Sequence, residues 1–530
     1  MSFIDARLYD GPADLSCDLC IVGGGAAGIT LARLMARTGR HIILLESGGL
    51  DYEGDTQALY RGKLSGVPYF DLSSCRLRYF GGSTSHYGGF CALPRRIDYE
   101  ARPEAGMPGW PIGYDDLIGY LKTAAGIMQV NYDELMDPRL GANQRGAGSA
   151  LIEDHDENKI LRTGIQIQSL KDSRKFNPRF VKEVEALPDT QTFLHANLTH
   201  IGLAGNQRTV AALTVKTLAG KTLTIKPRIT VLACHTIEVA RLLLASNDVI
   251  ARGIGNESDE VGRNFMDHIH VRAGKFVADP KRFLSRYAHD YILPEYKTAH
   301  WSEFQLTDET RLKNNMGHYG LVLEPHYTRA EEHTGDAVSR LVHDIFLPYH
   351  EQMAADMGTV LGHPVGAVSS TLARFGLRER KPLYYHLLQH IEQSPNPTSR
   401  VTLLPERDIL GVPMVELHYD LHEADFHTMN RGQELVSAEL AALGWGRFQL
   451  PTLTPDFIKD NILGVWHEMG TTKMADSPRV GVVDRNLLVH GTDNLYIASC
   501  SVFPSATTCW PTIHLIALTL RLADHLSAEV

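Results

Sequence analysis

The stretch CDLCIVGGGAAGITLARLMARTGRHIILLESGG, residues 17–49, decides the fold. An apolar run at residues 19–22 leads into a glycine-rich turn at residues 23–28, and an amphipathic helical pattern follows. A second apolar run, at residues 41–45, ends at Glu46. This order of strand, glycine turn, helix and strand is the βαβ unit that holds the pyrophosphate of a dinucleotide at the N-terminus of its helix.

The three glycines and the acid of this unit each have a physical role. Gly23 permits the tight turn, Gly25 lets the backbone approach a pyrophosphate, and Gly28 lets the helix pack on the strand. Glu46 lies 18 residues after Gly28 (46 − 28), where it can accept hydrogen bonds from ribose hydroxyls. An acid there disfavours a 2′-phosphate and hence NADP. The motif alone does not separate FAD from NAD, but its position near the N-terminus favours FAD.

The composition excludes several classes of protein. The chain has 530 residues, 43% of them hydrophobic, with a net charge of −10 and a pI near 6.2. It is long enough for two domains, and its charge argues against nucleic-acid or anionic-membrane binding. No apolar run is long enough for a membrane span, and the N-terminus lacks the apolar core of a secretory signal. Seven scattered cysteines do not form a disulfide framework, so we expect a cytoplasmic protein.

Cys17 and Cys20 form a CxxC, which is typical of metal and redox sites. Both lie in the apolar run CDLCIVG, and no second CxxC occurs to complete a zinc site. We therefore interpret them as buried strand residues and expect no metal site.

Five segments of the chain carry a resemblance to one protein family. They are GGGAAG with Glu46, RYFGGSTSHYGGFCALPRRIDYE (78–100), GWPIGYDDL (109–117), VLACHTIEVARLLLASN (231–247) with VGRNFMDH (261–268), and QSPNPTSRVTL (393–403) with the block 466–526. Together they resemble the glucose–methanol–choline (GMC) oxidoreductases, and most closely their bacterial sugar dehydrogenase and pyranose oxidase branch. The resemblance spans nearly the whole chain, although residues 276–380 give no motif. It implies an FAD-dependent enzyme that oxidises an alcohol or a sugar.

The family fold is α/β, with a Rossmann-like FAD-binding domain and a sheet-based (α+β) substrate domain. We expect the FAD-binding domain to combine residues 1–110, 190–275 and 460–530, and the substrate domain to combine residues 111–189 and 276–459. The substrate pocket should lie between them, over the flavin ring.

The loop FGGSTSHYGG is rich in glycine and hydroxyl groups, so it can lie flat along a cofactor. The resemblance places Gly82, Ser83 and His86 beside the flavin. Some relatives attach the flavin covalently to the histidine that matches His86. The alternative, favoured here, is a histidine that packs or forms hydrogen bonds. In the C-terminal block, the resemblance adds Ser501 and Thr512 to the cofactor-binding residues.

His467, in VWHEMGTTKM, matches the catalytic histidine of the family. Alcohol oxidation removes a hydroxyl proton and a hydride, and a neutral imidazole suits the role of base. Relatives have a second histidine or an asparagine just before the proline of the last helix. Trp510 stands there in this chain. An indole N–H donates one hydrogen bond but cannot accept a proton.

Three interpretations of Trp510 remain open. It forms a stacking wall for a ring-shaped substrate, or the reaction is not alcohol oxidation, or the register differs and brings Thr508 or Thr512 into the site. His514 is a weaker substitute because it lies one helical turn further on.

Some residues of the matching segments receive no catalytic role. The family usually has a small residue where His235 stands, and the sequence offers no reason for the change. Asp267 and His268 are interpreted as structural. The segment QIQSLKDSRKFNPRF (166–180) contains no cysteine where related dehydrogenases carry an iron–sulfur cluster, so no cluster is expected.

The sequence therefore predicts an FAD-dependent dehydrogenase or oxidase acting on a sugar, a glycoside or another ring-bearing secondary alcohol, with His467 as base. The alternatives are a flavoenzyme of altered chemistry (desaturase, isomerase or lyase) and a flavin-binding protein without catalysis. The expected partners are a small alcohol or glycoside and, for reoxidation of the flavin, an electron acceptor.

Overall fold

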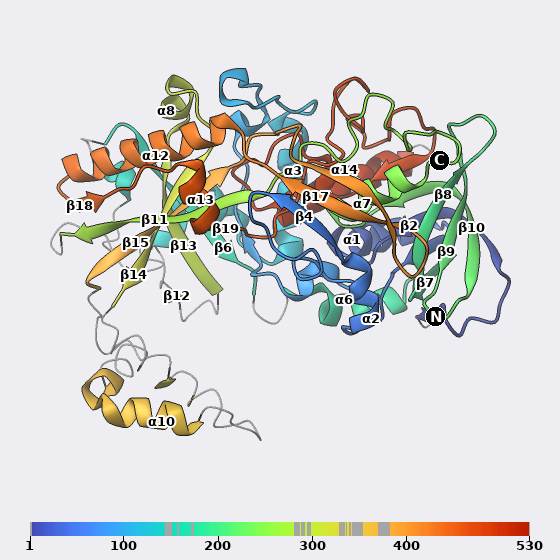
Figure 1. Cartoon of the computed structure of the whole chain (residues 1–530), viewed down its shortest axis with the longest axis horizontal. Helices are drawn as coiled ribbons and strands as arrows, with labels where there is room; N and C mark the ends of the chain where they lie inside the picture. Colours follow the sequence, from blue (N-terminus) through green and yellow to red (C-terminus); the bar gives the residue numbers. More distant parts are fainter. Residues whose placement is uncertain are drawn as a thin grey trace.

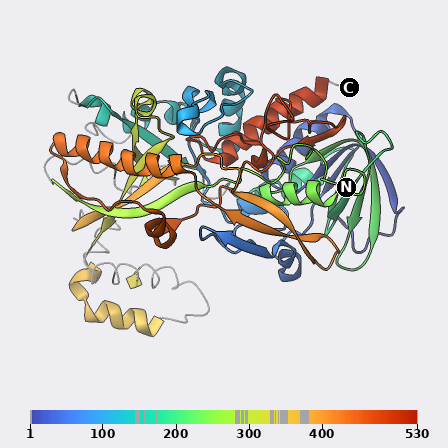
Figure 2. The same ribbon diagram turned by 45° about the horizontal axis from the view of Figure 1, so that its top comes forward.

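The computed structural model describes most of the chain as three β-sheets with covering helices (Figure 1). Residues near both termini lie at the same end of the molecule in two views (Figures 1 and 2). The described residues are 3–143, 151–155, 158–170, 174–279, 287, 292–293, 298–327, 334, 337–338, 341, 353–368 and 382–528.

An eight-stranded sheet carries the glycine-rich turn. Its order is β1-β7-β3-β2-β10-β9-β8, with β20 beside β10. Strand β2 runs parallel to both β3 and β10, whereas β9 is antiparallel to its neighbours. The strands are β1 (Ile4–Asp5), β2 (Asp14–Val22), β3 (Ile42–Leu45), β7 (Thr190–Leu194), β8 (Asn197–Leu203), β9 (Val210–Lys216), β10 (Thr222–Leu232) and β20 (Leu495–Ile497).

The apolar runs predicted as strands are the centre of this sheet. All four residues of β3 are buried, as expected for a parallel strand covered on both faces. Cys17 and Cys20 are buried in β2, and all seven cysteines are unpaired. Helices α1 (Ala26–Met35) and α3 (Tyr114–Met128) pack against the C-terminal helix α14 (Pro511–Ala528). The end of the chain thereby returns to the first βαβ unit.

A nine-stranded sheet, mainly antiparallel, forms the other end of the molecule. Its order is β18-β11-β15-β14-β13-β6-β5, with β12 beside β13 and β19 beside β11. Helix α12 (Glu423–Ala442) lies along this sheet in both views (Figures 1 and 2). The strands are β5 (Phe90–Cys91), β6 (Leu161–Gln168), β11 (His268–Ala278), β12 (Ile292–Leu293), β13 (Thr298–Leu306), β14 (Tyr319–His326), β15 (Tyr384–Glu392), β18 (Gly446–Gln449) and β19 (Ile462–Leu463).

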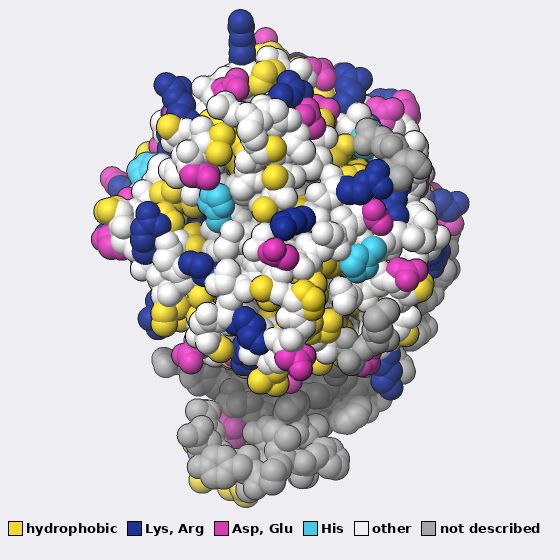
Figure 3. Space-filling view, turned by 90° about the vertical axis from the view of Figure 1, so that its right-hand side faces the viewer, with side chains coloured by type: hydrophobic (Ala, Val, Ile, Leu, Met, Phe, Trp, Pro, Cys, Tyr) yellow, Lys and Arg dark blue, Asp and Glu magenta, His cyan; other side chains and the backbone are white. Residues whose placement is uncertain are grey.

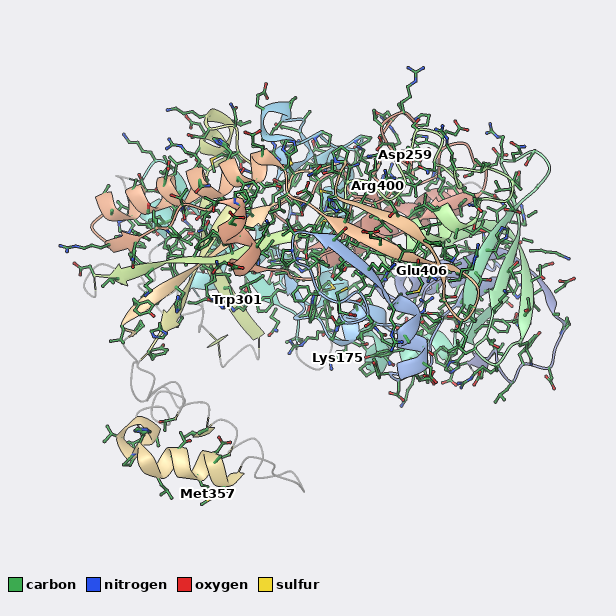
Figure 4. All side chains as sticks on the ribbon, in the orientation of Figure 1. Lys175, Asp259, Trp301, Met357, Arg400 and Glu406 are labelled. Carbon is green, nitrogen blue, oxygen red and sulfur yellow. The ribbon has the colours of Figure 1, made fainter. Side chains whose placement is uncertain are left out.

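A three-stranded sheet contacts helix α7 (Thr236–Ala245), which follows β10. It contains β16 (Arg400–Arg407), β17 (Pro413–Tyr419) and β4 (Gly62–Gly66). Arg400, at the start of β16, forms an ion pair of 3.1 Å with Asp259 (Figure 4). The remaining helices are α2 (Gly54–Gln57), α4 (Tyr132–Met136), α5 (Pro138–Asn143), α6 (Phe176–Glu185), α8 (Asp308–Lys313), α10 (Met353–Gly362) and α13 (Pro455–Asn461), with short 3-10 turns at Ala36–Thr38, Ala58–Tyr60, Gly82–Ser85, Arg96–Tyr99, Pro103–Ala105, Ile152–Asp154 and Cys500–Val502.

The predicted α/β fold, a Rossmann-like sheet with a second sheet-based unit, is confirmed. The division of the chain into two domains at the stated residues stays a prediction. Among the described helices, none combines the length and apolar character needed to cross a bilayer. On the face at the end of the eight-stranded sheet, Lys and Arg side chains alternate with Asp and Glu (Figure 3). The cytoplasmic location stays a prediction.

Candidate active site

The glycine-rich turn lies at one end of a cavity and has the shape of a phosphate cradle. Gly23 has a φ of +112°, and a Cβ on it would lie 2.7 Å from the Ala233 carbonyl oxygen. A Cβ on Gly28 would lie 1.8 Å from the Gly23 carbonyl oxygen, so only glycine lets α1 start this close to β2. A Cβ on Gly25, by contrast, would point into open space. Gly23 and Gly25 line the cavity, and Gly28 lies behind them.

Glu46 stands at the end of β3 and lines the same cavity. Its carboxylate accepts hydrogen bonds of 2.8 Å from the backbone N–H groups of Gly24 and Gly48. Burial raises the pKa of Glu46, and these two bonds with the nearby Arg78 oppose the rise. Each carboxylate oxygen keeps lone pairs for ribose hydroxyls, so the residues present fit the adenosine half of FAD.

The loop that follows Phe80 forms another wall of the cavity. Gly82, Ser83 and His86 all line it, and their contact with the flavin stays a prediction. The His86 ring stacks on Trp466, with ring centroids 5.0 Å apart and planes at 21°. Burial lowers the pKa of His86. A cofactor-facing position of His86 thus agrees with the geometry, and covalent attachment stays untested.

The two predicted cofactor residues of the C-terminal block differ in position. Thr512, in the first turn of α14, lines the cavity. Ser501 does not. Its side chain is buried, and its Oγ accepts a hydrogen bond of 2.7 Å from Thr472. The neighbouring Ser499 and Cys500 line the cavity instead, because residues 500–502 form a 3-10 turn that points Ser501 inward.

His467 lines the same cavity as Glu46. One carboxylate, Asp267, fixes the backbone that carries it. Asp267 accepts hydrogen bonds from the N–H groups of His467 (2.9 Å), Trp466 (3.2 Å) and Val465 (3.3 Å), and from the Tyr69 hydroxyl (2.9 Å). Burial raises the pKa of Asp267 to about 6 despite these bonds. Trp466 has a φ of +61°, which is rare for a bulky residue, so this turn is held in a strained conformation beside the cavity.

A hydrogen-bond chain fixes the tautomer of His467. His268 Nε2 lies 3.0 Å from the Thr507 carbonyl oxygen, which can only accept, so His268 Nε2 donates. Burial, with His390 next in importance, lowers the pKa of His268 to about 3, so its ring is neutral and its Nδ1 is an acceptor. His467 Nδ1, 3.0 Å away, must therefore donate to it. This leaves the lone pair of His467 on Nε2.

The pKa of His467 itself lies well below its usual value. Burial is the main cause, and the neighbouring His268, His270 and His390 add to it. His467 is therefore a neutral imidazole with one unprotonated nitrogen, in the wall of the cavity. This is the state that a general base requires.

Trp510 lies directly against His467. Their ring centroids are 4.4 Å apart at 84°, and the indole also stacks on His390 at 5.2 Å and 24°. The side chain lines the cavity but is only 8% exposed, and its Nε1 has no hydrogen-bond partner. Thr508, one of the alternatives, donates to Asp98 at 2.7 Å. His514 bonds the Tyr99 hydroxyl at 3.0 Å. Neither lines the cavity, whereas Thr512 does.

His235 has a partner that the sequence did not suggest. It precedes α7, and its Nε2 lies 2.9 Å from Glu468 Oε2. Both residues line the cavity. Burial lowers the pKa of His235 well below its usual value and raises that of Glu468 to about 7. His235 is therefore neutral near pH 7, and the Glu468 carboxyl is partly protonated.

The sequence analysis missed His268 as a functional residue. Its motif, VGRNFMDH, was noticed but interpreted as structural. The structure brings Asp267 and His268 to opposite sides of His467, one on its backbone and one on its ring. The adjacency of two polar residues before a strand was the available signal.

Comparisons with known proteins agree with this geometry. A profile of the GMC oxidoreductase family matches residues 395–519. The 2-methyl-1,2-propanediol dehydrogenase of Mycolicibacterium austroafricanum is 23% identical, over 96% of this chain and 95% of its own. The fructose dehydrogenase large subunit of Gluconobacter japonicus is 25% identical, over 56% of this chain and 46% of its own.

Among solved structures, pyridoxine 4-oxidase from "Mesorbium loti" has a TM-score of 0.55 at 19% identity, covering 96% of this chain and 99% of its own. The fold, the C-terminal family profile and the full-length relatives agree with one another. Residues 395–519 therefore form a GMC oxidoreductase domain, the whole chain has the fold of these enzymes, and the protein is an FAD-dependent oxidoreductase that acts on alcohols or sugars.

Proposed function

We propose that this enzyme oxidises a secondary alcohol on a ring, in a sugar, a glycoside or a comparable compound, with His467 as the base. The observation that carries the proposal is the fixed lone pair on His467 Nε2. Bound FAD would supply the two-electron acceptor for the hydride. His467 takes the hydroxyl proton, and its Nδ1–H bond to His268 keeps Nε2 unprotonated until then.

Aromatic side chains around His467 support a ring-bearing substrate. Trp510 and Trp466 flank His467 on the cavity wall, and the Trp466 side chain is 39% exposed. Flat aromatic faces bind the apolar faces of sugar rings and aromatic rings. The buried Trp510 Nε1 without a partner offers a donor to a substrate oxygen. The names of the two dehydrogenase relatives also refer to hydroxyl-bearing compounds.

The direct experiment is anaerobic. Purified flavin-loaded protein is mixed with monosaccharides, glycosides, aromatic alcohols and simple alcohols while the oxidised flavin absorption is followed. Bleaching by ring-bearing secondary alcohols at lower concentrations than by simple alcohols is expected. Readmitting air then separates an oxidase from a dehydrogenase. Protein that stays yellow with every alcohol contradicts the proposal.

Trp510 favours a second candidate, a flavoenzyme of altered chemistry such as a desaturase, isomerase or lyase. In this case the indole replaces the polar partner because no alkoxide has to be held. Reduction of the flavin by a compound without a hydroxyl group, or turnover without net redox change, would support this candidate.

The base should stay active at mildly acidic pH. Because the folded-state pKa of His467 lies well below 6.5, its neutral form predominates above that value. We expect kcat/KM for alcohols to stay flat from about pH 8 to about pH 6.5. The profile should be measured also in Glu468→Gln, because the Glu468 carboxyl has a pKa of about 7. An acid limb above pH 6.5 that persists in this variant would contradict the expectation.

His268 should act as a positioning residue through the tautomer of His467. His268→Leu removes the acceptor for His467 Nδ1–H, and we expect kcat/KM to fall by about 100-fold or more. His268→Gln can accept from His467 through Oε1 and donate to Thr507 through Nε2. It should therefore recover to within about tenfold of the original enzyme. Equal activity of the two flavin-loaded variants would refute the tautomer role.

Trp510→Asn restores the residue type found in relatives. We expect it to retain or raise activity on simple alcohols, because the amide can hold a substrate hydroxyl and the smaller side chain opens space beside His467. Removing a buried indole should also lower the free energy of unfolding by about 3–5 kcal/mol. Rates are compared at equal flavin content. An inactive variant that is folded and flavin-bound would show that the indole is required.

A further inference from the structure

Behind Trp510, the nine-stranded sheet gathers three side chains with metal-binding atoms. Glu303 lies on β13, His318 directly before β14, and His390 on β15. Glu303 Oε1 lies 3.9 Å from His318 Nε2, and Glu303 Oε2 lies 3.5 Å from His390 Nδ1. One nitrogen or oxygen from each residue lies within 4.8 Å of the others. The three residues are 1%, 1% and 2% exposed, so water does not compete for these atoms.

The strand register explains why they meet. Gly320 pairs with His390 on one side and with Gln305 on the other. Gln305, Gly320 and His390 therefore stand side by side on three neighbouring strands. His318 is two residues from Gly320, and Glu303 is two residues from Gln305, so their side chains lie on the same face of the sheet as that of His390. Glu303 Oε2 lies 2.8 Å from the point where a Cβ on Gly320 would stand. Glycine at position 320 therefore leaves the space that the carboxylate fills between the two histidines.

Several of these atoms lack hydrogen-bond partners. His318 Nε2 and both ring nitrogens of His390 are buried without one. The Glu303 carboxylate, in contrast, is held in place by the side-chain amides of Gln166 and Gln305. Buried polar atoms are nearly always paired, so three orphaned nitrogens around one oriented carboxylate call for an explanation. A protonated His390 would pair with Glu303 but would leave His318 Nε2 orphaned.

The guanidinium groups near the cluster do not contact Glu303 directly. Arg311 and Arg102 are ion-paired with Asp98 and Glu392. The buried Arg162 donates to the Gln305 side-chain oxygen and acts on the Glu303 charge only from a distance. Within the described part of the chain, no Lys or Arg forms an ion pair with Glu303. A buried carboxylate is normally paired with a cation or bound to a metal.

We propose that Glu303, His318 and His390 bind a divalent transition-metal ion of the zinc class. Two imidazoles and one carboxylate are the ligands of a zinc site that keeps a fourth, non-protein ligand. One ion would give partners to His318 Nε2, to His390 Nδ1 and to the Glu303 charge together. No metal was expected from the sequence, where only the CxxC of Cys17 and Cys20 was weighed as a site. The three ligands proposed here are spread over residues 303–390 and show no recognisable spacing.

The site is linked to the active site through Trp510. The His390 ring stacks on the indole, and the indole contacts His467. A metal bound to His390 fixes the plane of this ring and, through it, the position of Trp510 beside the base. The role is structural and does not depend on which alcohol is oxidised.

The test measures metal rather than turnover. Tag-free, flavin-loaded protein is stripped with a chelator, dialysed and titrated with Co²⁺, whose ligand-field bands lie at longer wavelengths than the flavin absorption. We expect saturation at about one ion per chain, displacement by Zn²⁺, and about one Zn²⁺ per chain by mass spectrometry after reloading. No saturable binding, or no change in the cobalt bands on binding, overturns the proposal.

Variants locate the site. Glu303→Gln and His390→Gln should each weaken Co²⁺ binding by more than about 100-fold, beyond the loss produced by an outer-shell residue. His386→Gln is the matched control, because it removes a partly exposed imidazole from the same face of β15. It should bind like the original protein. Unchanged binding in either ligand variant overturns the assignment. If a ligand variant does not fold, X-ray absorption of the zinc-loaded protein decides: imidazole scattering at about 2.0 Å supports the site, and its absence refutes it.

Discussion

His467→Ala should lower kcat for the alcohol substrate by about 10²–10⁴-fold, the usual contribution of a positioned general base. The loss should appear in the rate of flavin reduction under anaerobic conditions. Flavin content should not change, because the glycine turn and Glu46, the residues expected to hold the adenosine half of the cofactor, are left intact. Added imidazole should restore part of the rate, since the variant leaves space where the ring stood.

A matched control is His200→Ala. His200 is a partly exposed histidine whose Nε2 bonds Asp248 at 2.8 Å, and it does not line the cavity. Its loss should leave flavin reduction unchanged. If the flavin of the His467→Ala variant were reduced at the original rate, another group would have to be the base. The unprotonated Nε2 of His467 would then not be required for the reaction.

Arg311→Leu should destabilise the folded protein by about 3–5 kcal/mol, because it leaves buried carboxylates without their cation. The Arg311 side chain is fully buried and lies 3.2 Å from Asp98 and 3.3 Å from Glu392. Arg102, 3.4 Å from Glu392, also acts on Asp98, but it is ion-paired only with Glu392 and cannot replace the contacts of Arg311 with both acids. The shift should appear in urea unfolding followed by tryptophan fluorescence and by flavin release.

The control is Arg96→Leu. Arg96 forms a shorter ion pair, 2.7 Å to Asp115, but both side chains are more than half exposed. Its removal should leave the free energy of unfolding nearly unchanged, because solvent screens an exposed ion pair. Arg311 should also affect catalysis, because Asp98 accepts from Thr508 and Glu392 accepts from the Thr507 N–H. Equal shifts for the two variants would show that the buried cluster contributes little.

The first βαβ unit could be predicted because its evidence is local. The strand, the turn and Glu46 all lie within residues 17–49. The nine-stranded sheet could not be predicted in the same way. Its strands β11 and β15 pair across more than 100 residues, and much of the chain between them carries no motif. Such pairing depends on packing between distant segments, which alternation along one strand does not reveal.

The site shows the same limit. His467 was predicted because its own motif marks it, but its tautomer depends on His268 and on the Thr507 carbonyl, 239 residues further along the chain. Ser501 was predicted beside the cofactor, and a single 3-10 turn directs it inward. Sequence patterns identify the type of a residue, whereas hydrogen-bond direction and side-chain orientation depend on the folded surroundings.

The hydrogen bonds that run from His467 to His268 end at the backbone carbonyl of Thr507, and this has an evolutionary consequence. No side-chain replacement at position 507 can delete a carbonyl group. Thr507 holds a φ of +59°, and its N–H is bonded to Glu392, so the direction of its carbonyl is set by the path of the turn. Neighbouring side chains, Trp510 among them, can therefore vary with a new substrate. The Thr507 carbonyl still orients His268, and through it the imidazole of His467 that accepts the proton. The scaffold can acquire new specificities without rebuilding its chemistry.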